Sequence, residues 1–183
     1  VANTSSCTNG ETSETACGFV VEFADIISEQ AMNSTETNVG GWPTSTMRTY
    51  VNGTIYNSLP SELQNVIVTT TVVSSHGKTS GEANFTSSDK LYLLSTKEVW
   101  NGGTGYDTAE AETRQLDYYK NNGVTISNYS GAIKQYNGTN SYWWLRSAHS
   151  DYTTHFFNVY INGGLGCNFA ISTYGVAPAF RIA

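Results

Sequence analysis

Short runs of hydrophobic and β-branched residues, separated by polar stretches, recur along this chain and predict strands. The clearest run is Val66 to Ser74, where Val, Ile and Thr predominate. Lys90 to Leu94 predicts a short apolar strand, and Phe19 to Ile27 fits either a strand or a short helix. The polar stretches from Asn33 to Asn38 and from His76 to Ser88 predict loops between these elements.

Helices are predicted in the middle of the chain, where hydrophobic residues recur every three or four positions. The first follows Gly40-Gly41-Trp42-Pro43, with Thr44 or Ser45 as its N-cap and Gly53 as a weak point. Its recurring hydrophobic positions are Met47, Tyr50, Val51 and Ile55. Pro60 to Leu63 predicts a second helix start, because proline is favoured near the first helical position.

Two later segments also carry helix signals. Ser95 is followed three positions later by Glu98, which is a capping-box pattern, so a short helix is expected there. Thr108 to Lys120 predicts a longer helix from its content of Ala, Glu, Arg and Gln. Asn121-Asn122-Gly123 is expected to end that helix.

From Tyr142 onward the pattern predicts strands alone, divided by turns rich in Gly, Asn and Ser. The predicted strands cover residues 142–146, 156–160, 166–171 and 176–182. Helices in the middle followed by a late run of short strands predict an α+β fold, with mixed or antiparallel strands and two or three helices. The length fits a single domain over residues 1–183, which opens with a polar, turn-rich segment over residues 1–17.

Composition and charge are typical of an exported protein and narrow the range of partners. Charged residues make up only 13% of the chain, the net charge is −6, and Lys and Arg cluster nowhere, so a nucleic-acid partner is not expected. No stretch is long and apolar enough to predict membrane insertion by this domain. The chain starts at Val1 rather than at Met, which indicates a processed product or an excised piece.

The three cysteines also bear on location. Cys7 and Cys17 flank a short polar loop, and a disulfide between them is plausible in an exported protein, with two free thiols as the alternative. Cys167 is then unpaired, and a lone cysteine is more often packed than reactive. The expected location is therefore extracellular, on a cell surface or a phage virion.

Catalytic signatures are absent from the sequence. There is no G-x-S-x-G turn, no phosphate-binding glycine loop, no C-x-x-C and no H-E-x-x-H. His149, Asp151 and His155 could hold a divalent metal if their loop folds back on itself, but their spacing favours surface polar residues. The acidic residues fall mostly where a solvated surface is expected rather than a carboxylate pair. We therefore predict no catalytic residue, no metal site, no cofactor and no enzymatic activity.

The segment from His149 to Tyr174 has an unusual composition. Its 26 residues contain no Lys, Glu, Gln, Met or Trp, although these types make up 25 of the 183 residues. Independent draws would give such a gap about one time in fifty. The remaining types can be reached by changing the first two bases of an Asn codon that ends in a pyrimidine, whereas the five missing types cannot. The alternative explanation is that turn-rich strands avoid Lys, Glu, Gln and Met anyway.

The aromatic residues of this segment point to binding. Tyr152, Phe156, Tyr160, Phe169 and Tyr174 lie among Gly and Asn, so several of them are expected to be exposed. Surfaces rich in Tyr, Gly, Ser and Asn are typical of adaptable binding sites. Large exposed apolar groups usually mark an interaction site.

Several blocks, which together span nearly the whole chain, resemble a bacterial family of surface domains of unknown function, common in gut Firmicutes and their phages. The blocks are Gly40-Gly41-Trp42-Pro43 with Met47-Arg48, Asp89 to Ser95, Arg114 to Asp117, Trp143-Trp144-Leu145-Arg146-Ser147 and Gly175 to Phe180. The C-terminal part also resembles the variable proteins of diversity-generating retroelements. Those proteins share a C-type-lectin-like fold of the formylglycine-generating-enzyme type, and an error-prone reverse transcriptase rewrites adenines in their genes, often in Asn codons.

This resemblance implies a C-type-lectin-like fold in which two strands within residues 141–183, WWLRS and GVAPAFRIA, are a fixed scaffold. The positions that it implies as variable and ligand-binding are His149, Asp151, Tyr152, His155, Phe156, Tyr160, Ile161, Gly164, Cys167, Phe169, Ile171 and Tyr174. It does not imply formylglycine synthesis, which uses paired cysteines and copper, because only Cys167 lies in the corresponding half. A calcium-dependent sugar site is not expected either, because the Glu-Pro-Asn, Gln-Pro-Asp and Trp-Asn-Asp triplets do not occur.

The sequence therefore predicts a receptor-recognition or adhesion domain that presents a variable face to an unidentified protein or glycan on a cell surface. Two alternatives stay open. One is a hydrolase or metal-dependent enzyme that acts on surface polysaccharide. The other is a structural adhesion spacer with no specific ligand.

Overall fold

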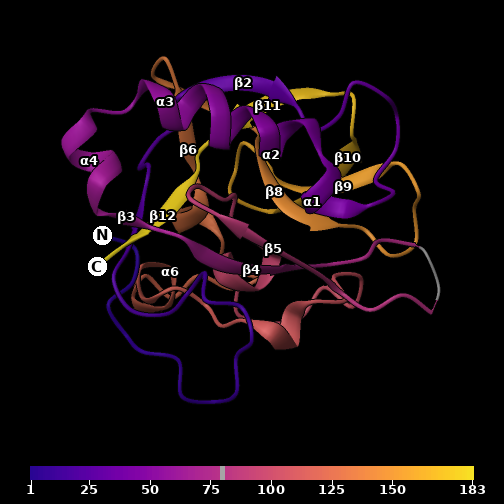
Figure 1. Cartoon of the computed structure of the whole chain (residues 1–183). Helices are drawn as coiled ribbons and strands as arrows, with labels where there is room; N and C mark the ends of the chain where they lie inside the picture. Colours follow the sequence, from indigo (N-terminus) through magenta and orange to yellow (C-terminus); the bar gives the residue numbers. More distant parts are fainter. Residues whose placement is uncertain (79–80) are drawn as a thin grey trace.

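Four of the five strands of the largest sheet come from the last third of the chain (Figure 1). In order across the sheet, its strands are β10 (Leu165–Phe169), β9 (His155–Val159), β8 (Trp143–Ala148), β11 (Thr173–Val176) and β2 (Ser28–Ala31). Neighbouring strands are antiparallel except β11 and β8, which are parallel. The computed structural model describes residues 1–78 and 81–183, and it confirms the predicted α+β fold with a strand-rich C-terminal region.

The strands predicted after Tyr142 are present, with their ends shifted. The single strand predicted over residues 176–182 is divided into the end of β11 and a separate strand, β12 (Ala179–Ile182). Pro178 lies between the two, and a proline has no N–H to donate to a sheet. The sequence did not predict β2, because this edge strand is only partly buried and has no alternation of apolar and polar residues.

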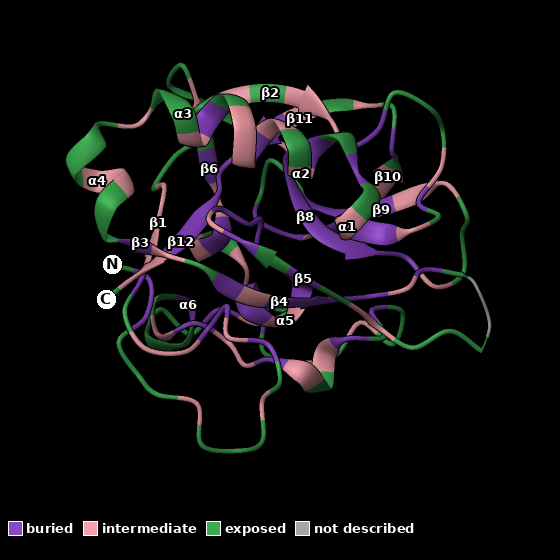
Figure 2. Ribbon diagram, in the orientation of Figure 1, coloured by how far each residue is buried: buried purple, intermediate pink, exposed green. Residues whose placement is uncertain are grey.

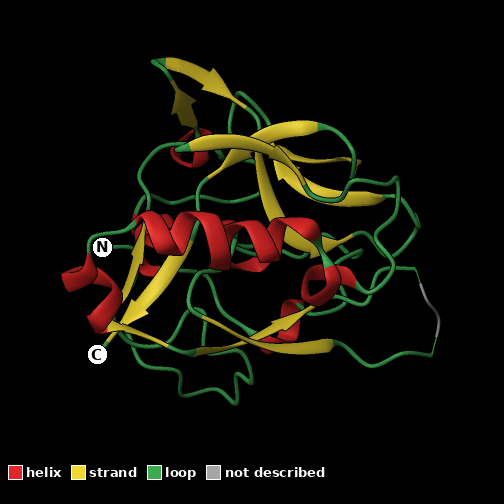
Figure 3. Cartoon of the chain, turned by 45° about the horizontal axis from the view of Figure 1, so that its top comes forward, coloured by secondary structure: helices red, strands yellow, loops and turns green. Residues whose placement is uncertain are grey.

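A second sheet of three short strands joins the two ends of the chain. β1 (Val20–Glu22) and β3 (Ile67–Val68) pair antiparallel with opposite edges of β12. The N- and C-termini lie on the same side of the molecule (Figures 1 and 3). β1 confirms the strand alternative for residues 19–27, and β3 with β4 (Thr70–Ser74) confirms the strand predicted over residues 66–74.

β4 pairs with β5 (Phe85–Asp89), so the loop predicted over residues 76–88 is wrong at its end, while residues 79–80 of it lie outside the described residues. The side chains of β5 are mostly polar, and its buried Asp89 is tolerated because side chains of the helical run donate hydrogen bonds to it. Asp89 Oδ2 accepts a hydrogen bond from Trp42 Nε1 at 3.0 Å, and Asp89 Oδ1 accepts one from Arg48 Nε at 2.6 Å. A separate hairpin consists of β6 (Lys134–Tyr136) and β7 (Thr139–Ser141).

The helix predicted after Pro43 is a run of short pieces. They are α1 (Gly41–Thr44), α2 (Thr46–Tyr50), a π-helical turn η1 (Val51–Ile55) and α3 (Tyr56–Ser58), followed by α4 (Ser61–Val66) after Pro60. Ser45 caps α2, since its Oγ accepts from the Arg48 amide at 3.0 Å. Gly53 does not break the run but lies within η1. Figure 3 shows the run crossing the molecule between the five-stranded sheet and β4–β5, and α1 contacts both β8 and β5.

The glycine pair at the start of α1 is required by this close packing. Gly41 has a φ of 56°, and a Cβ added to it would lie 2.8 Å from the carbonyl oxygen of Ser75. Gly40 has a φ of 82°, and a Cβ there would lie 2.1 Å from Oγ1 of Thr44. Only glycine fits both conditions, so this part of the G-G-W-P block is explained by packing.

The helix predicted over residues 108–120 is wrong for most of its length. In its place the chain forms a 3-10 turn, η2 (Glu110–Glu112), and a short helix, α6 (Asp117–Asn121). Between them Gln115 Nε2 donates to the carbonyl oxygens of Val99 and Val124, at 2.9 and 2.8 Å. These bonds to distant backbone override a favourable helix propensity.

Residues 91–94 are buried and Lys90 is half-buried, but residues 90–94 do not form the predicted strand. Tyr92 makes an isolated bridge to Ala179 through two backbone hydrogen bonds, at 3.0 and 2.8 Å. The short helix predicted after Ser95 is confirmed as α5 (Thr96–Val99). The Ser95 amide donates to Glu98 Oε2 at 2.9 Å, as a capping box requires. A further 3-10 turn, η3 (Ser130–Ala132), precedes β6.

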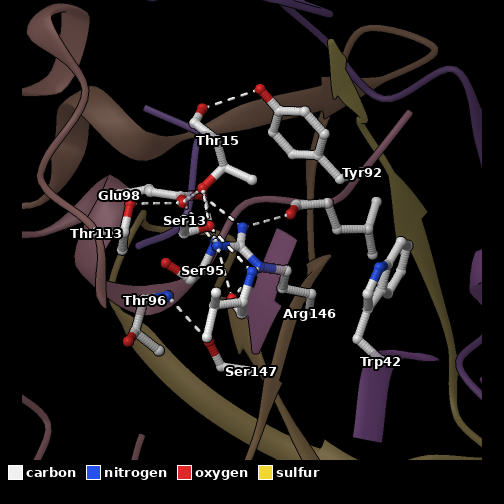
Figure 4. A network of polar contacts seen from close by, with 12 residues as sticks. Ser13, Thr15, Trp42, Tyr92, Ser95, Thr96, Glu98, Thr113, Arg146 and Ser147 are labelled. Atoms are coloured by element: carbon white, nitrogen blue, oxygen red, sulfur yellow. Dashed lines mark hydrogen bonds and ion pairs between the residues drawn. The ribbon is translucent and has the colours of Figure 1, made fainter. Parts of the chain in front are cut away.

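β8 is buried along its whole length (Figure 2) and forms the middle of the core. Trp143, Trp144 and Leu145 have no exposed surface. Arg146 is also fully buried, and its guanidinium donates to both carboxylate oxygens of Glu98, at 2.6 and 2.7 Å (Figure 4). This hydrogen-bonded ion pair explains why a charged residue stands within an otherwise apolar strand.

Cys7 and Cys17 form a disulfide, so the predicted pairing is confirmed. This bond is consistent with an extracytoplasmic location, because disulfides persist in oxidising compartments. Among the residues that the structure describes, none of the helices combines the length and the hydrophobicity that a bilayer crossing requires.

Candidate binding surface

The segment from His149 to Tyr174 forms a loop, the β9–β10 hairpin and the start of β11. One buried side chain from the N-terminal third holds the loop in place. Asn38 Nδ2 donates to the carbonyl oxygens of Tyr152 and His155, both at 2.8 Å, and to that of His149 at 3.2 Å. The Asn38 amide also donates to the carbonyl oxygen of Thr153, at 2.7 Å. Four hydrogen bonds from Asn38 therefore hold the backbone of this loop.

The twelve predicted positions divide into three groups by exposure. The exposed ones are Asp151, Tyr152, Tyr160, Ile161, Phe169 and Ile171. The half-buried ones are His155, Cys167 and Tyr174. The buried ones are His149, Phe156 and Gly164.

The three buried positions correct the prediction of an exposed surface at those points. Phe156 points into the core from β9 and has no exposed surface. His149 is 6% exposed and lies against the ring of Tyr106. Gly164 lies in the β9–β10 turn, where a Cβ would meet the ring of Tyr129 at 3.6 Å. A side chain at these positions is constrained by packing, so they do not belong to a display surface.

Five rings lie in a row along the loop and the hairpin, and we call them the aromatic stripe. They are Tyr106, His149, Tyr152, His155 and Phe169. The centroids of successive rings are 4.8, 4.7, 4.6 and 4.4 Å apart. Tyr106, Tyr152 and Phe169 remain 44%, 48% and 43% exposed. The stripe therefore combines contacts between neighbouring rings, one pair stacked and three tilted, with a large accessible apolar area.

The two imidazoles of the stripe are uncharged at neutral pH. Burial lowers the pKa of His149, and the Asp151 carboxylate opposes this shift only in part. Burial likewise lowers the pKa of His155, against the smaller influence of Glu36. His149 Nδ1 also accepts a hydrogen bond from the Asp151 amide at 3.1 Å, which requires an unprotonated nitrogen.

The opposite face of the hairpin carries a second group of rings, which we call the tyrosine cluster. Its members are Tyr142, Trp144, Tyr160 and Tyr174. Tyr142 stacks on Tyr174 at 5.0 Å and meets Tyr160 edge-on at 5.4 Å. The strand register separates the two groups, because Trp144 is paired with Asn158 and Phe169 with His155, and these two β9 positions point to opposite faces.

The residues of the H-x-D-x₃-H constellation make local hydrogen bonds within the loop. Within residues 1–78 and 81–183, no three His, Cys, Asp or Glu side chains gather closely enough to hold a metal ion. His155 Nδ1 lies 2.7 Å from Oγ1 of Thr154. Cys167 is half-buried on β10, and burial raises the pKa of its thiol, so it stays protonated at neutral pH.

Sequence reasoning missed three residues of this surface. Tyr106 belongs to the stripe, Tyr142 belongs to the tyrosine cluster, and Asn38 fixes the loop. Tyr106 follows a glycine-rich stretch, so the criterion of an aromatic residue among glycines, applied to the whole chain, would have found it. Asn38 carried no comparable signal, because its role depends on contacts more than a hundred residues away in sequence.

One protein-family model matches the chain, over residues 20–183, and its description is Domain of unknown function (DUF6273). The match covers the strands, the helical run and the whole candidate surface. No curated protein and no solved structure matches the chain.

Proposed function

We propose that this chain, which belongs to the DUF6273 family of domains of unknown function, is a non-catalytic binding domain that contacts a partner molecule through its aromatic stripe. The observation that carries this proposal is the exposure of three rings, Tyr106, Tyr152 and Phe169, which the imidazoles of His149 and His155 join into one row. Exposed apolar rings are unfavourable in water unless a partner covers them, and aromatic residues dominate the energetics of known interfaces.

The organisation of the surface supports recognition by interchangeable side chains. The loop backbone is fixed by Asn38, and the strand before it is held by the buried pair of Arg146 and Glu98. Exposed side chains on such a fixed backbone can change without loss of the fold. This is the property that a variable protein of a diversity-generating retroelement, with a C-type-lectin-like fold, would need. The display positions in this proposal are the nine exposed or half-buried ones, without His149, Phe156 and Gly164.

The partner in this proposal is a protein or a glycan on a cell surface. The Cys7–Cys17 disulfide supports an extracellular location. The rings of Tyr152 and Phe169 supply contact area with few rotatable bonds, so little conformational entropy is lost on binding. The half-buried imidazole of His155 adds a hydrogen-bonding group without a net charge.

The two rival functions make different predictions. A spacer with no ligand would bury its aromatic residues, whereas the stripe leaves three rings more than 40% exposed. A polysaccharide hydrolase would need two close carboxylates or a tightly bound metal, so metal analysis of the purified protein and assays on surface polysaccharides test that alternative.

The direct test compares two triple variants on arrays of cell-surface proteins and glycans. The first changes the stripe, by Tyr106→Ser, Tyr152→Ser and Phe169→Ser. The matched control changes three other exposed apolar residues, by Phe19→Ser, Tyr118→Ser and Ile126→Ser, which are 45%, 47% and 45% exposed. We expect the control to keep the signals of the unchanged protein and the stripe variant to lose them by about tenfold or more. Equal signals from all three proteins contradict the proposal.

A further inference from the structure

Asn158 lies in the middle of β9 with no exposed surface, yet its side-chain amide is unpaired. Neither Oδ1 nor Nδ2 has a hydrogen-bond partner in the part of the chain that the structure describes. A buried amide without partners is unfavourable, and such groups are uncommon in native proteins. A hydrophobic side chain of similar size would avoid the penalty, so the amide at this position needs an explanation.

The surroundings of Asn158 show where a partner group could reach it. The strand register places Asn158 in a row with Gly166 of β10 on one side and Trp144 of β8 on the other. A Cβ added to Gly166 would lie 2.5 Å from Asn158 Oδ1 and 2.2 Å from Cε1 of Tyr160. The ring of Tyr160 therefore lies on the bare backbone of Gly166, directly beside the amide.

The side chain of Tyr160 covers this position and has few contacts of its own. It follows the last residue of β9, and its side chain is 39% exposed. Its ring meets Tyr142 edge-on at 5.4 Å, and no hydrogen bond joins its hydroxyl to another described residue. Rotation of this one side chain would open a flat space above Gly166, bordered by the Asn158 amide.

We propose that this space is a binding subsite for a primary carboxamide, the side-chain group of Asn or Gln in a partner protein, and that Asn158 binds it. Asn158 offers a donor nitrogen and an acceptor oxygen side by side in one plane. A primary carboxamide has an acceptor oxygen and a donor nitrogen in the same geometry, so it can pair with both atoms of the Asn158 amide. A carboxylate only accepts and an ammonium only donates, so each leaves one Asn158 atom unpaired.

The competing planar group is an adenine edge, which also pairs with an amide through two hydrogen bonds. The net charge of −6 and the absence of any cluster of Lys and Arg in the sequence disfavour a nucleic acid, so the protein side chain is the better match. The missing Cβ of Gly166 gives the flat carboxamide the room that Tyr160 now fills.

This inference rests on the proposed function, because Tyr160 and Tyr174 belong to the predicted binding positions. It concerns the tyrosine cluster, however, on the opposite face of the hairpin from the aromatic stripe. A test that uses a small probe is independent of the stripe and of the natural partner.

The test is a titration of the ¹⁵N-labelled protein with N-acetylglutamine methylamide, with N-acetylglutamate methylamide as the matched probe. The side-chain NH₂ signal of Asn158 is identified by its loss in Asn158→Leu. We expect that signal to shift saturably with the glutamine probe and not with the glutamate probe. In Tyr160→Ala we expect the glutamine probe to bind about tenfold more tightly, because a cover that is open only part of the time reduces the apparent affinity.

Two further variants complete the test. Asn158→Leu is expected to fold and to lose the response of the neighbouring backbone signals to the glutamine probe. If Asn158→Leu does not fold, the affinity of Tyr160→Ala for the glutamine probe still tests the proposal. Tyr152→Ser in the stripe is expected to leave the titration unchanged, so a failure of the stripe and a failure of this subsite are distinguishable. Equal shifts with both probes, or unchanged affinity in Tyr160→Ala, overturn the proposal.

Discussion

The Arg146 guanidinium and the Glu98 carboxylate make two hydrogen bonds, at 2.6 and 2.7 Å, and neither side chain is exposed to solvent. The pair joins β8 to α5. Thr113 Oγ1 donates to the same carboxylate at 3.0 Å, and Tyr92 closes the network by donating to the carbonyl oxygen of Thr15 at 2.9 Å (Figure 4). The strand that leads into the candidate surface is therefore fixed by charge as well as by apolar packing.

Replacing Glu98 by Gln should destabilise the fold by about 3 to 5 kcal/mol, because it leaves the buried Arg146 charge without its counter-ion. The measurement is the free energy of unfolding by urea. Glu36→Gln removes the same charge from an exposed side chain, and its effect should stay within about 0.5 kcal/mol. If both variants lost the same small amount, the ion pair would not be holding the scaffold.

The sequence predicted the structure correctly where that structure depends on residues close together in the chain. The strands after Tyr142, the cap at Ser45 and the capping box at Ser95 are all confirmed, because each depends on residues within a few positions. The Cys7–Cys17 disulfide is also local, since it spans a sequence separation of only 10.

The sequence did not predict the structure where contacts between residues far apart in the chain determine it. β5 is polar, and Trp42 and Arg48 from the helical run satisfy its Asp89. The burial of Phe156 and the exposure of Phe169 depend on which distant segments cover each side chain, and composition does not encode those contacts. The stripe could not be assembled from the sequence, because Tyr106 meets His149 across a long separation.

Removing the side chain of Asn38 should loosen the binding loop more than the rest of the fold. Asn38→Ala deletes three hydrogen bonds to loop carbonyls and should lower stability by about 1 to 3 kcal/mol. Amides of residues 149–155 should exchange with solvent faster, while those of β8 keep their protection. Thr35→Ala, at an exposed position of the same connection, is the control. Uniformly faster exchange, or no change in the loop, would contradict the assigned role.

Reducing the disulfide should destabilise the N-terminal segment without abolishing the fold. The Cys7→Ser and Cys17→Ser double variant opens a short loop, and the expected loss is about 2 to 3 kcal/mol. The segment keeps other attachments, such as the hydrogen bond from Arg181 Nε to the Cys17 carbonyl oxygen at 2.9 Å. Thermal unfolding with and without a reductant measures the effect. The double variant should be insensitive to the reductant, and a loss of stability on reduction of that variant would assign the effect to something other than this bond.

Acidification should weaken the fold through the two imidazoles of the stripe. Burial lowers the folded-state pKa of His149 and His155 below 6.5, so the unfolded chain binds protons first as the pH falls. The stability that they contribute is complete above about pH 6.5 and declines as the pH falls through the lower folded-state pKa. Asp151 and Glu36 reduce this decline, because they favour the charged imidazoles, whereas the repulsion between the two histidines increases it.

A His149→Phe, His155→Phe double variant keeps two aromatic rings that do not titrate. Its melting temperature should therefore fall less than that of the unchanged protein between about pH 7 and pH 5. Parallel pH profiles for the two proteins would show that these histidines are not the groups responsible.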